Sequence, residues 1–209
     1  MEVINNNVIL CGTVCDGPRF SHVGGNESYY TFPLEIERLS GAADRINIVA
    51  KQSQIEALGI EDAPRLMIIG QLRSFNNKQS KGSKLVITVL AGEMFFTYDE
   101  YQNQVSLTGA VCKPTTLRKT PMGRQICDIM LAVNRSYGRS DYLPCIAWGQ
   151  LAEAASTFAV GDRVTLRGRI QSRKYLKAEG DIMAERTAYE VSVVTFAGDE
   201  PGAEDEGTA

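Results

Sequence analysis

Histidine is almost absent from this sequence, since His22 is the only one among 209 residues. A single histidine leaves no Ser/His/Asp or Cys/His triad, which argues against hydrolysis by such a site. The five cysteines form no C-x-x-C pair and cluster with no histidine. We therefore expect no zinc site, no other metal and no cofactor, and we interpret the cysteines as small buried hydrophobes.

Long apolar runs are also missing. No stretch of about 18 apolar residues could span a bilayer, and the N-terminus "MEVINNNVIL" lacks the basic region and apolar core of a secretory signal. The composition, 44% hydrophobic and 22% charged, is that of an ordinary soluble globular protein. These features predict a cytoplasmic location.

Positive charge is scarce over the whole chain, whose formal net charge is −3, but it is unevenly distributed. Residues 199–209 hold five acids and no base, so the rest of the chain has 22 bases against 20 acids. Residues 99–198 hold 13 bases and 10 acids, whereas residues 1–98 hold 9 and 10. The second half therefore carries the local excess of positive charge that a nucleic-acid surface needs.

The strongest pattern is an internal repeat. "NNVILCGTVC" (6–15) aligns with "NQVSLTGAVC" (103–112), an offset of 97 residues. That offset, or one residue more, aligns further identical pairs: Arg38 with Arg135, Asp44 with Asp141, Gly70 with Gly168, and Ser74 with Ser172. We predict two copies of one domain, over 1–98 and 99–198, followed by an acidic disordered tail over 199–209.

Each copy consists of short β-runs with one interruption. In the second copy we expect strands near 104–112, 124–134, 141–149, 162–173 and 188–197, separated by turn signals. The alanine-rich "QLAEAASTFAVGD" between the third and fourth strands predicts a helix, as does "QSQIEAL" (52–58) in the first copy. This order predicts an all-β chain of two tandem OB-folds, five-stranded barrels each with a short helix between strands 3 and 4.

Two strands of the second copy, which we expect to be neighbours, carry the candidate ligand surface. In "SDYLPCIAWG", alternation places Tyr142 and Trp148 on the outer face, with Leu143, Cys145 and Ala147 inside. In "RGRIQSRKY" (167–175), alternation places the arginines and the final tyrosine on one face, with Gly168, Ile170 and Ser172 turned inward. Rings stack on unpaired bases and arginines contact phosphates, so this pattern favours single-stranded nucleic acid. Core or interface packing of the rings is the alternative.

These segments, with "NQVSLTGAV", "DIMLAVNRSY" and "YEVSVVTF", resemble the bacterial single-stranded DNA-binding protein family over nearly all of 103–197. The resemblance implies four base-stacking positions: Tyr137, Tyr142, Trp148 and Tyr175. With it we expect phosphate contacts from Arg135, Arg167, Arg169, Arg173 and Lys174. Further contacts are expected from Arg118, Lys119 and Arg124, for which a solvated hairpin is an equal explanation.

The first copy resembles the family more weakly, and its counterparts of the four aromatics are Ser40, Arg45, Lys51 and Asn77. This copy either binds the DNA backbone weakly or mainly supports assembly. The weaker contacts that we expect from it are Arg45, Lys51, Arg73, Phe75, Lys78 and Lys81. A mixed-charge segment of the second copy, "KYLKAEGDIMAERTA" (174–188), is expected to form a loop at the rim of the binding face.

The resemblance also bears on partners. Family members assemble four such domains, which implies a homodimer here, and they recruit replication and repair proteins through a hydrophobic tip on the acidic tail. The sequence "EDEGTA" has no such tip, so the tail is either solvated or a weak competitor of DNA for the basic face.

The sequence therefore predicts a non-enzymatic, nucleoid-associated protein. It is expected to bind and protect single-stranded DNA in replication, recombination or repair, and the sequence leaves open whether RNA is also a ligand. The alternative is an OB-fold adaptor or primosome-type accessory protein that acts through protein contacts. A third option, a metal-dependent nuclease, is disfavoured because the binding strands carry no acid except Asp141.

Overall fold

The computed structural model describes residues 5–58, 65–77, 85–179 and 182–197. The first half contains β1 (Asn6–Val14), β2 (Arg19–Gly24), β3 (Glu27–Glu37), β4 (Ala43–Lys51), α1 (Gln52–Ala57), β5 (Arg65–Asn76) and β6 (Leu85–Thr97). The second half contains β7 (Gln102–Val111), β8 (Thr116–Lys119), β9 (Gln125–Asn134), η1 (Ser136–Gly138), β10 (Ser140–Trp148), α2 (Gln150–Ala155), β11 (Arg163–Glu179) and β12 (Ile182–Phe196).

Each half is a barrel closed by five strands. In the first, the hydrogen-bonded order β3-β4-β6-β5-β1 is closed by pairing of β1 with β3, and in the second β9-β10-β12-β11-β7 is closed by β7 with β9. The helices α1 and α2 follow β4 and β10, the third strands of the two barrels. The predicted pair of all-β, five-stranded OB barrels, each with its helix between strands 3 and 4, is confirmed.

One strand in each half was not expected. β2 and β8 pair only with β3 and β9, as the outer arms of hairpins beside the barrels. Their residues are almost all exposed, so the alternation of buried and exposed positions that reveals barrel strands is missing from them.

The expected rim loop over 174–188 was also wrong, since most of this segment is strand. β11 and β12 continue their antiparallel pairing from Leu166 opposite Phe196 as far as Glu179 opposite Ile182. Lys174 lies opposite Thr187, and its Nζ reaches diagonally across the two strands to lie 3.0 Å from the Glu185 carboxylate. Mixed charge therefore marks cross-strand pairing here rather than a loop.

The repeated glycines mark the places where barrel strands approach most closely. A Cβ added to Gly12 would lie 2.4 Å from the Glu35 carbonyl oxygen, and one added to Gly109 would lie 2.5 Å from that of Ala132. Gly70 and Gly168 would each clash at 2.3 Å with a backbone oxygen of the neighbouring strand, and both follow a register shift. Glycine at these positions lets the sheet bend and close.

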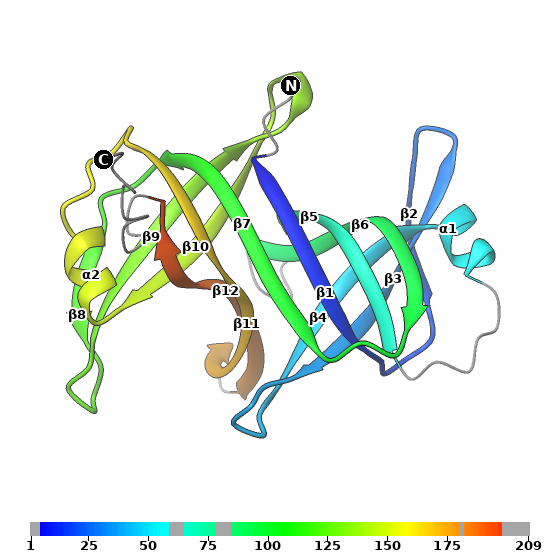
Figure 1. Cartoon of the computed structure of the whole chain (residues 1–209), viewed down its shortest axis with the longest axis horizontal. Helices are drawn as coiled ribbons and strands as arrows, with labels where there is room; N and C mark the ends of the chain where they lie inside the picture. Colours follow the sequence, from blue (N-terminus) through cyan, green and yellow to red (C-terminus); the bar gives the residue numbers. More distant parts are fainter. Residues whose placement is uncertain (1–4, 59–64, 78–84, 180–181, 198–209) are drawn as a thin grey trace, which may run out of the picture.

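The two barrels share one continuous twelve-stranded sheet, because β1 pairs antiparallel with β7 from Asn6 opposite Leu107 to Cys11 opposite Gln102. In Figure 1 the second barrel lies on the left and the first on the right, with β1 beside β7 between them. Large apolar side chains such as Leu10, Leu34, Leu107 and Leu131 are fully buried inside the barrels. The two barrels are thus joined by backbone hydrogen bonds between β1 and β7 as well as by the covalent connection from β6 to β7.

Candidate nucleic-acid interface

The outer face of β10 presents two aromatic side chains to solvent. Tyr142 is 50% exposed and Trp148 is 37% exposed, while Leu143, Cys145 and Ala147, which alternate with them, are buried. Burial raises the pKa of the Cys145 thiol from 9.0 to about 12, and the nearby Glu190 adds to the effect. The inner face is therefore buried core, and the rings are left outside the barrel as the alternation predicts, although Ile146 between them is also buried.

Trp148 lies in a shallow basic hollow. The hollow has a volume of about 440 Å³ and is lined by Lys119, Gly123, Arg124, Gln125, Trp148 and Gly149. β8 and the turn before β9 thus bring two of the expected phosphate-binding side chains to the tryptophan. A ring flanked by two cations suits a base with its phosphate.

The third residue of that hairpin, Arg118, is already paired. Its Nε lies 2.5 Å from Asp128 Oδ2 and its second nitrogen 3.0 Å from Oδ1, and both side chains are about half exposed. This bidentate contact raises the pKa of the guanidinium further above its ordinary value. Arg118 therefore offers less free positive charge than Lys119 or Arg124.

Tyr137 is held on a strained turn. It sits in η1 with φ 70° and ψ 30°, making it the only residue other than glycine with positive φ in the described ranges. Its side chain is completely exposed, so no packing explains the left-handed backbone. Strain of this kind concentrates at functional positions, and here it holds a ring in solvent beside β10.

Tyr175 lies on the β11–β12 arm beyond both barrels. The guanidinium carbon of Arg173 lies 5.9 Å from the centre of its ring, within the range of a cation–π contact. Arg173 and Lys174 are exposed, and Tyr175 is partly buried. The arm thus carries a ring and two cations that were expected to act together.

Arg167 and Arg169 are exposed on β11, but this strand does not neighbour β10, because β12 lies between them. Arg167 lies opposite Ser106 of β7 and Thr195 of β12. The expectation that these arginines stand on the strand next to Tyr142 and Trp148 was therefore wrong. Strand order in a barrel does not follow chain order, and alternation alone does not reveal it.

Arg135 belongs to the junction between the barrels. Its Nε lies 2.6 Å from Asp141 Oδ2, and it donates to the Ser74 carbonyl oxygen of the first barrel at 3.1 Å. Asp141 is fully buried, accepts a hydrogen bond from the Ser74 backbone N–H, and also contacts Arg73 at 3.1 Å. The Ser74 hydroxyl in turn accepts the Tyr142 N–H at 2.7 Å.

The same network occurs a second time with the barrels exchanged. Asp44, also fully buried, pairs with Arg38 at 2.6 Å and accepts the Ser172 backbone N–H of the second barrel at 2.8 Å. The Arg45 N–H donates to the Ser172 hydroxyl at 3.3 Å. The repeated Arg, Asp and Ser identities are therefore the reciprocal contacts of the junction, and Ser172 faces the other barrel rather than its own core.

In the first barrel, the counterparts of the aromatic positions serve local structure. Arg45 forms an ion pair with Asp16, and the Lys51 N–H donates to Gln54 Oε1 at 2.9 Å at the start of α1. Ser40 is exposed in a turn, and Asn77 follows β5. Of the weaker contacts expected there, Phe75 is 53% exposed and Arg73 joins the junction, while Lys78 and Lys81 lie outside the described residues.

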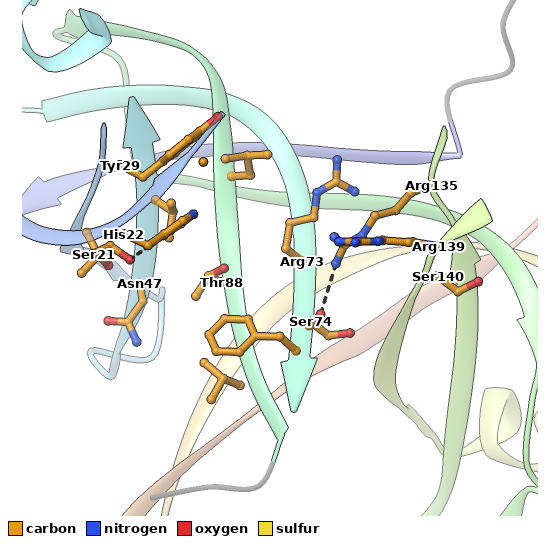
Figure 2. Close-up of a pocket in the computed structure, with 16 residues that line it drawn as sticks. Ser21, His22, Tyr29, Asn47, Arg73, Ser74, Thr88, Arg135, Arg139 and Ser140 are labelled. Carbon is orange, nitrogen blue, oxygen red and sulfur yellow. Dashed lines mark hydrogen bonds between the residues drawn. The ribbon is translucent and has the colours of Figure 1, made fainter. Parts of the chain in front are cut away.

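A larger groove between the barrels was not anticipated. It has a volume of about 810 Å³, and Figure 2 shows His22 and Tyr29 at one end and Arg73, Arg135 and Arg139 at the other. His22 and Tyr29 were missed because β2 has no alternation and neither residue aligns with a base-stacking position. The Gly24–Gly25 turn signal after His22 was the only local hint of a hairpin there.

Within the described ranges, no three His, Cys, Asp or Glu side chains gather where they could hold a metal ion. None of the helices in the part of the chain that the structure describes has the length and apolar character to cross a membrane.

Comparison of the fold with solved structures covers both barrels. The wild-type single-stranded DNA binding protein from Thermus aquaticus superposes with a TM-score of 0.73, over 98% of this chain and 96% of that chain, at 23% identity. At this identity the likeness shows the fold alone. The two-barrel arrangement is thus shared as a whole, and not only one barrel of it.

Comparison of the sequence concerns the second barrel. Single-stranded DNA-binding protein B of Bacillus subtilis is 38% identical over 85 residues, which are 37% of this chain and 75% of that protein. Single-stranded DNA-binding protein 2 of Listeria innocua is 35% identical over 85 residues, 37% of this chain and 54% of that protein. The family model described as "Single-strand binding protein family" matches residues 102–197. The chain therefore belongs to the single-strand binding protein family.

Proposed function

We propose that this protein binds single-stranded DNA with little sequence preference and protects it during replication, recombination or repair. The observation that carries the proposal is the outer face of β10, where Tyr142 and Trp148 are exposed although the alternating residues form buried core. The names of its relatives describe the same ligand. Duplex DNA hides the base faces, so exposed rings favour a single strand.

In this proposal the bases stack on Tyr137, Tyr142, Trp148 and Tyr175. Lys119 and Arg124 neutralise phosphates beside Trp148, and Arg173 does so beside Tyr175, with a smaller share from Lys174 because it pairs with Glu185. Arg167 and Arg169 extend the basic surface along β11. We assign Arg118 a smaller share because Asp128 holds it, and we assign Arg135 to the junction because Asp141 and Ser74 hold it.

The first barrel has two parts in the proposal. Its Asp44 accepts a hydrogen bond from the Ser172 N–H and so holds β11 just before Arg173 and Tyr175. Its Ser74 hydroxyl accepts a hydrogen bond from the N–H of Tyr142. It thereby orients two of the stacking positions without touching a base. Arg45, Lys51 and the exposed Phe75 would add weaker direct contacts with the DNA. The contact from Arg45 is weakened because its side chain is paired with Asp16.

Assembly and partners complete the proposal. The outer face of the sheet runs without interruption across β5, β1, β7 and β11 and carries Ile9 and Ile69, both only partly buried. Such a face suits a homodimer with four barrels, which sedimentation of the 22.9 kDa chain would test. The tail over 199–209, outside the described residues, is a further contact for replication or repair proteins. We propose no catalytic role, and DNA binding would place the protein with the nucleoid.

Titration with oligo(dT) tests the function directly, because Trp148 is the only tryptophan. Stacking of thymine on the indole would quench its fluorescence strongly, and the affinity would fall as the salt concentration rises. An unchanged signal with no measurable binding would overturn the proposal. Incubation of a labelled strand with Mg²⁺ in the same experiment would reveal cleavage if the protein were a nuclease.

A further inference from the structure

The groove between the barrels has the features of a second ligand site. Its long wall is the outer face of the first barrel, including Asn47, Val49, Phe75 and Thr88, and its far lip is the turn before β10 of the second barrel. The groove has a volume of about 810 Å³ and is lined by residues of both domains. No stacking position implied by the family resemblance lies among its lining residues.

One end of the groove is a preassembled aromatic platform. The rings of His22 and Tyr29 are parallel, with 4.9 Å between their centres and 4° between their planes, as seen edge-on in Figure 2. The Ser21 hydroxyl lies 3.0 Å from His22 Nδ1 and restricts the imidazole. A Cβ on Gly24 would lie 3.1 Å from Tyr29 Cε2, so the bare backbone of Gly24 leaves room for the ring. His22 is exposed, which leaves its outer face open to continue the stack.

The other end of the groove is positively charged. Arg73, Arg135 and Arg139 line it, and no Asp or Glu is among the lining residues. Arg73 and Arg135 share the single buried carboxylate of Asp141 behind the wall. Arg139 is exposed and forms no ion pair with any described residue. The lining thus brings together three guanidinium groups, of which two share one carboxylate, and leaves net positive charge at this end of the groove.

A flat ring platform at one end and uncompensated arginines at the other match a molecule that is both planar and anionic. A nucleotide has these properties, whereas a neutral sugar lacks the charge and an acidic peptide lacks a planar group for the platform. The groove also adjoins the proposed interface, since Ser74 and Ser140 line it and the Ser74 hydroxyl holds the N–H of Tyr142.

We propose that the groove holds nucleotides of the same DNA strand that lies on the second barrel, with a base on the outer face of His22 and a phosphate at Arg139. This inference rests on the proposed function. It assigns the first barrel a direct stacking site of its own, built from β2 and β3 rather than from the positions that carry the aromatics of the second barrel. The strand would then pass from one barrel to the other within a single chain.

The test compares labelled oligo(dT) of about 10 and about 30 nucleotides by fluorescence anisotropy with the full chain, lengths chosen around the ~4–16 nucleotides that one OB-fold covers. His22→Ala should weaken binding of the long strand about fivefold or more and change the short strand little. Arg139→Ala should weaken the long strand and lower the slope of log affinity against log salt by about 1.

Phe20→Ala is the matched control. Phe20 lies on β2 as well and is 59% exposed, but it packs edge-on against Tyr30 and does not line the groove. If His22→Ala and Arg139→Ala affect the long strand no more than Phe20→Ala, the groove proposal is overturned. Retained quenching of Trp148 in that case would leave the proposed function standing, whereas absence of binding and quenching in the unmodified protein would remove both.

A tryptophan placed in the groove gives an independent readout. In the double variant Trp148→Phe with His22→Trp, the only indole reports on the aromatic platform. Oligo(dT) of about 30 nucleotides should quench it, as a stacked base requires. Binding seen by anisotropy without any change in this fluorescence would show that no base reaches the platform.

Discussion

The two barrels share a topology and a junction but not an outer face. Asp44 and Asp141 occupy equivalent positions, are both fully buried, and each accepts the backbone N–H of a serine in the opposite barrel. The residue after each aspartate differs: Arg45 is held by Asp16, whereas Tyr142 is exposed. The residues of the junction contact the opposite barrel and therefore tolerate few substitutions, whereas residues on an outer face can be substituted more freely.

The difference shows where the two copies of a duplicated domain are free to diverge. Removing either aspartate would leave a partly buried arginine of its own barrel and a serine N–H of the other barrel without their acceptor, so the junction keeps both copies alike. No such coupling ties Trp148 to its counterpart Lys51, which begins α1. The copies are therefore constrained where they touch and independent where they face solvent.

The largest expected effect concerns this shared junction. Asp141→Ala leaves Arg73, Arg135 and the Ser74 N–H without their buried acceptor, and we expect the free energy of unfolding to fall by about 3 kcal/mol. Asp44→Ala should cost a similar amount. Urea denaturation followed by circular dichroism measures both.

Asp128→Ala is the control for the junction variants. Its pair with Arg118 is about half exposed, so the loss should stay below ~1 kcal/mol. A junction variant that is no more destabilised than Asp128→Ala, or a large difference between Asp44→Ala and Asp141→Ala, would break the proposed symmetry.

The second effect concerns the outer faces. The combined variant Tyr142→Ala and Trp148→Ala loses two stacking rings, and we expect its affinity for oligo(dT) to fall about thirtyfold or more. The combined variant Arg45→Ala and Lys51→Ala, at the equivalent positions of the first barrel, should lose only a few-fold. Anisotropy at one salt concentration compares them, and equal losses would refute the asymmetry.

A smaller effect is expected from the junction serines. The Ser74 hydroxyl accepts the Tyr142 N–H at 2.7 Å, and the Ser172 hydroxyl accepts that of Arg45 at 3.3 Å. Ser74→Ala should lower the free energy of unfolding by about 1 kcal/mol, because the N–H of Tyr142 loses its acceptor, and Ser172→Ala by less. Urea denaturation measures the pair, and a reversed order would contradict the hydrogen-bond geometry.

The smallest effect concerns the buried thiol of Cys145, which has no cysteine at the equivalent position of the first barrel. Cys145 aligns with Ile48 of the first barrel, and burial raises its pKa from 9.0 to about 12. The folded state binds this proton more tightly, so stability is retained below pH 9 and is lost progressively as the pH rises from about 9 to 12. Between pH 8 and 9, unmodified protein should lose roughly half a kcal/mol more than Cys145→Val. Equal pH dependence of the two proteins would show that the thiol is not buried as described.

Much of this architecture is accessible from local sequence. Alternation in "SDYLPCIAWG" assigns Leu143, Cys145 and Ala147 to the core and both rings to the surface, as the structure has them. The arm beyond Tyr175 escaped prediction because its mixed charges resemble a loop until the strands are paired. The role of Arg135 escaped prediction because an arginine six residues before an aspartate does not reveal which other chain segments contact the pair.

Periodicity and repeats are properties of neighbouring residues, so local sequence predicts the duplication, the two barrels, and the rings on the outside of the second. The folded chain adds that β12 separates β11 from β10, that the repeated Arg, Asp and Ser residues form a reciprocal junction, and that a groove has His22 at one end and Arg139 at the other. The contacts of Asp141 with Ser74 and of Asp44 with Ser172 join residues more than 60 positions apart, and their geometry follows from barrel closure and from the pairing of β1 with β7. Local pattern carries no information about such distances.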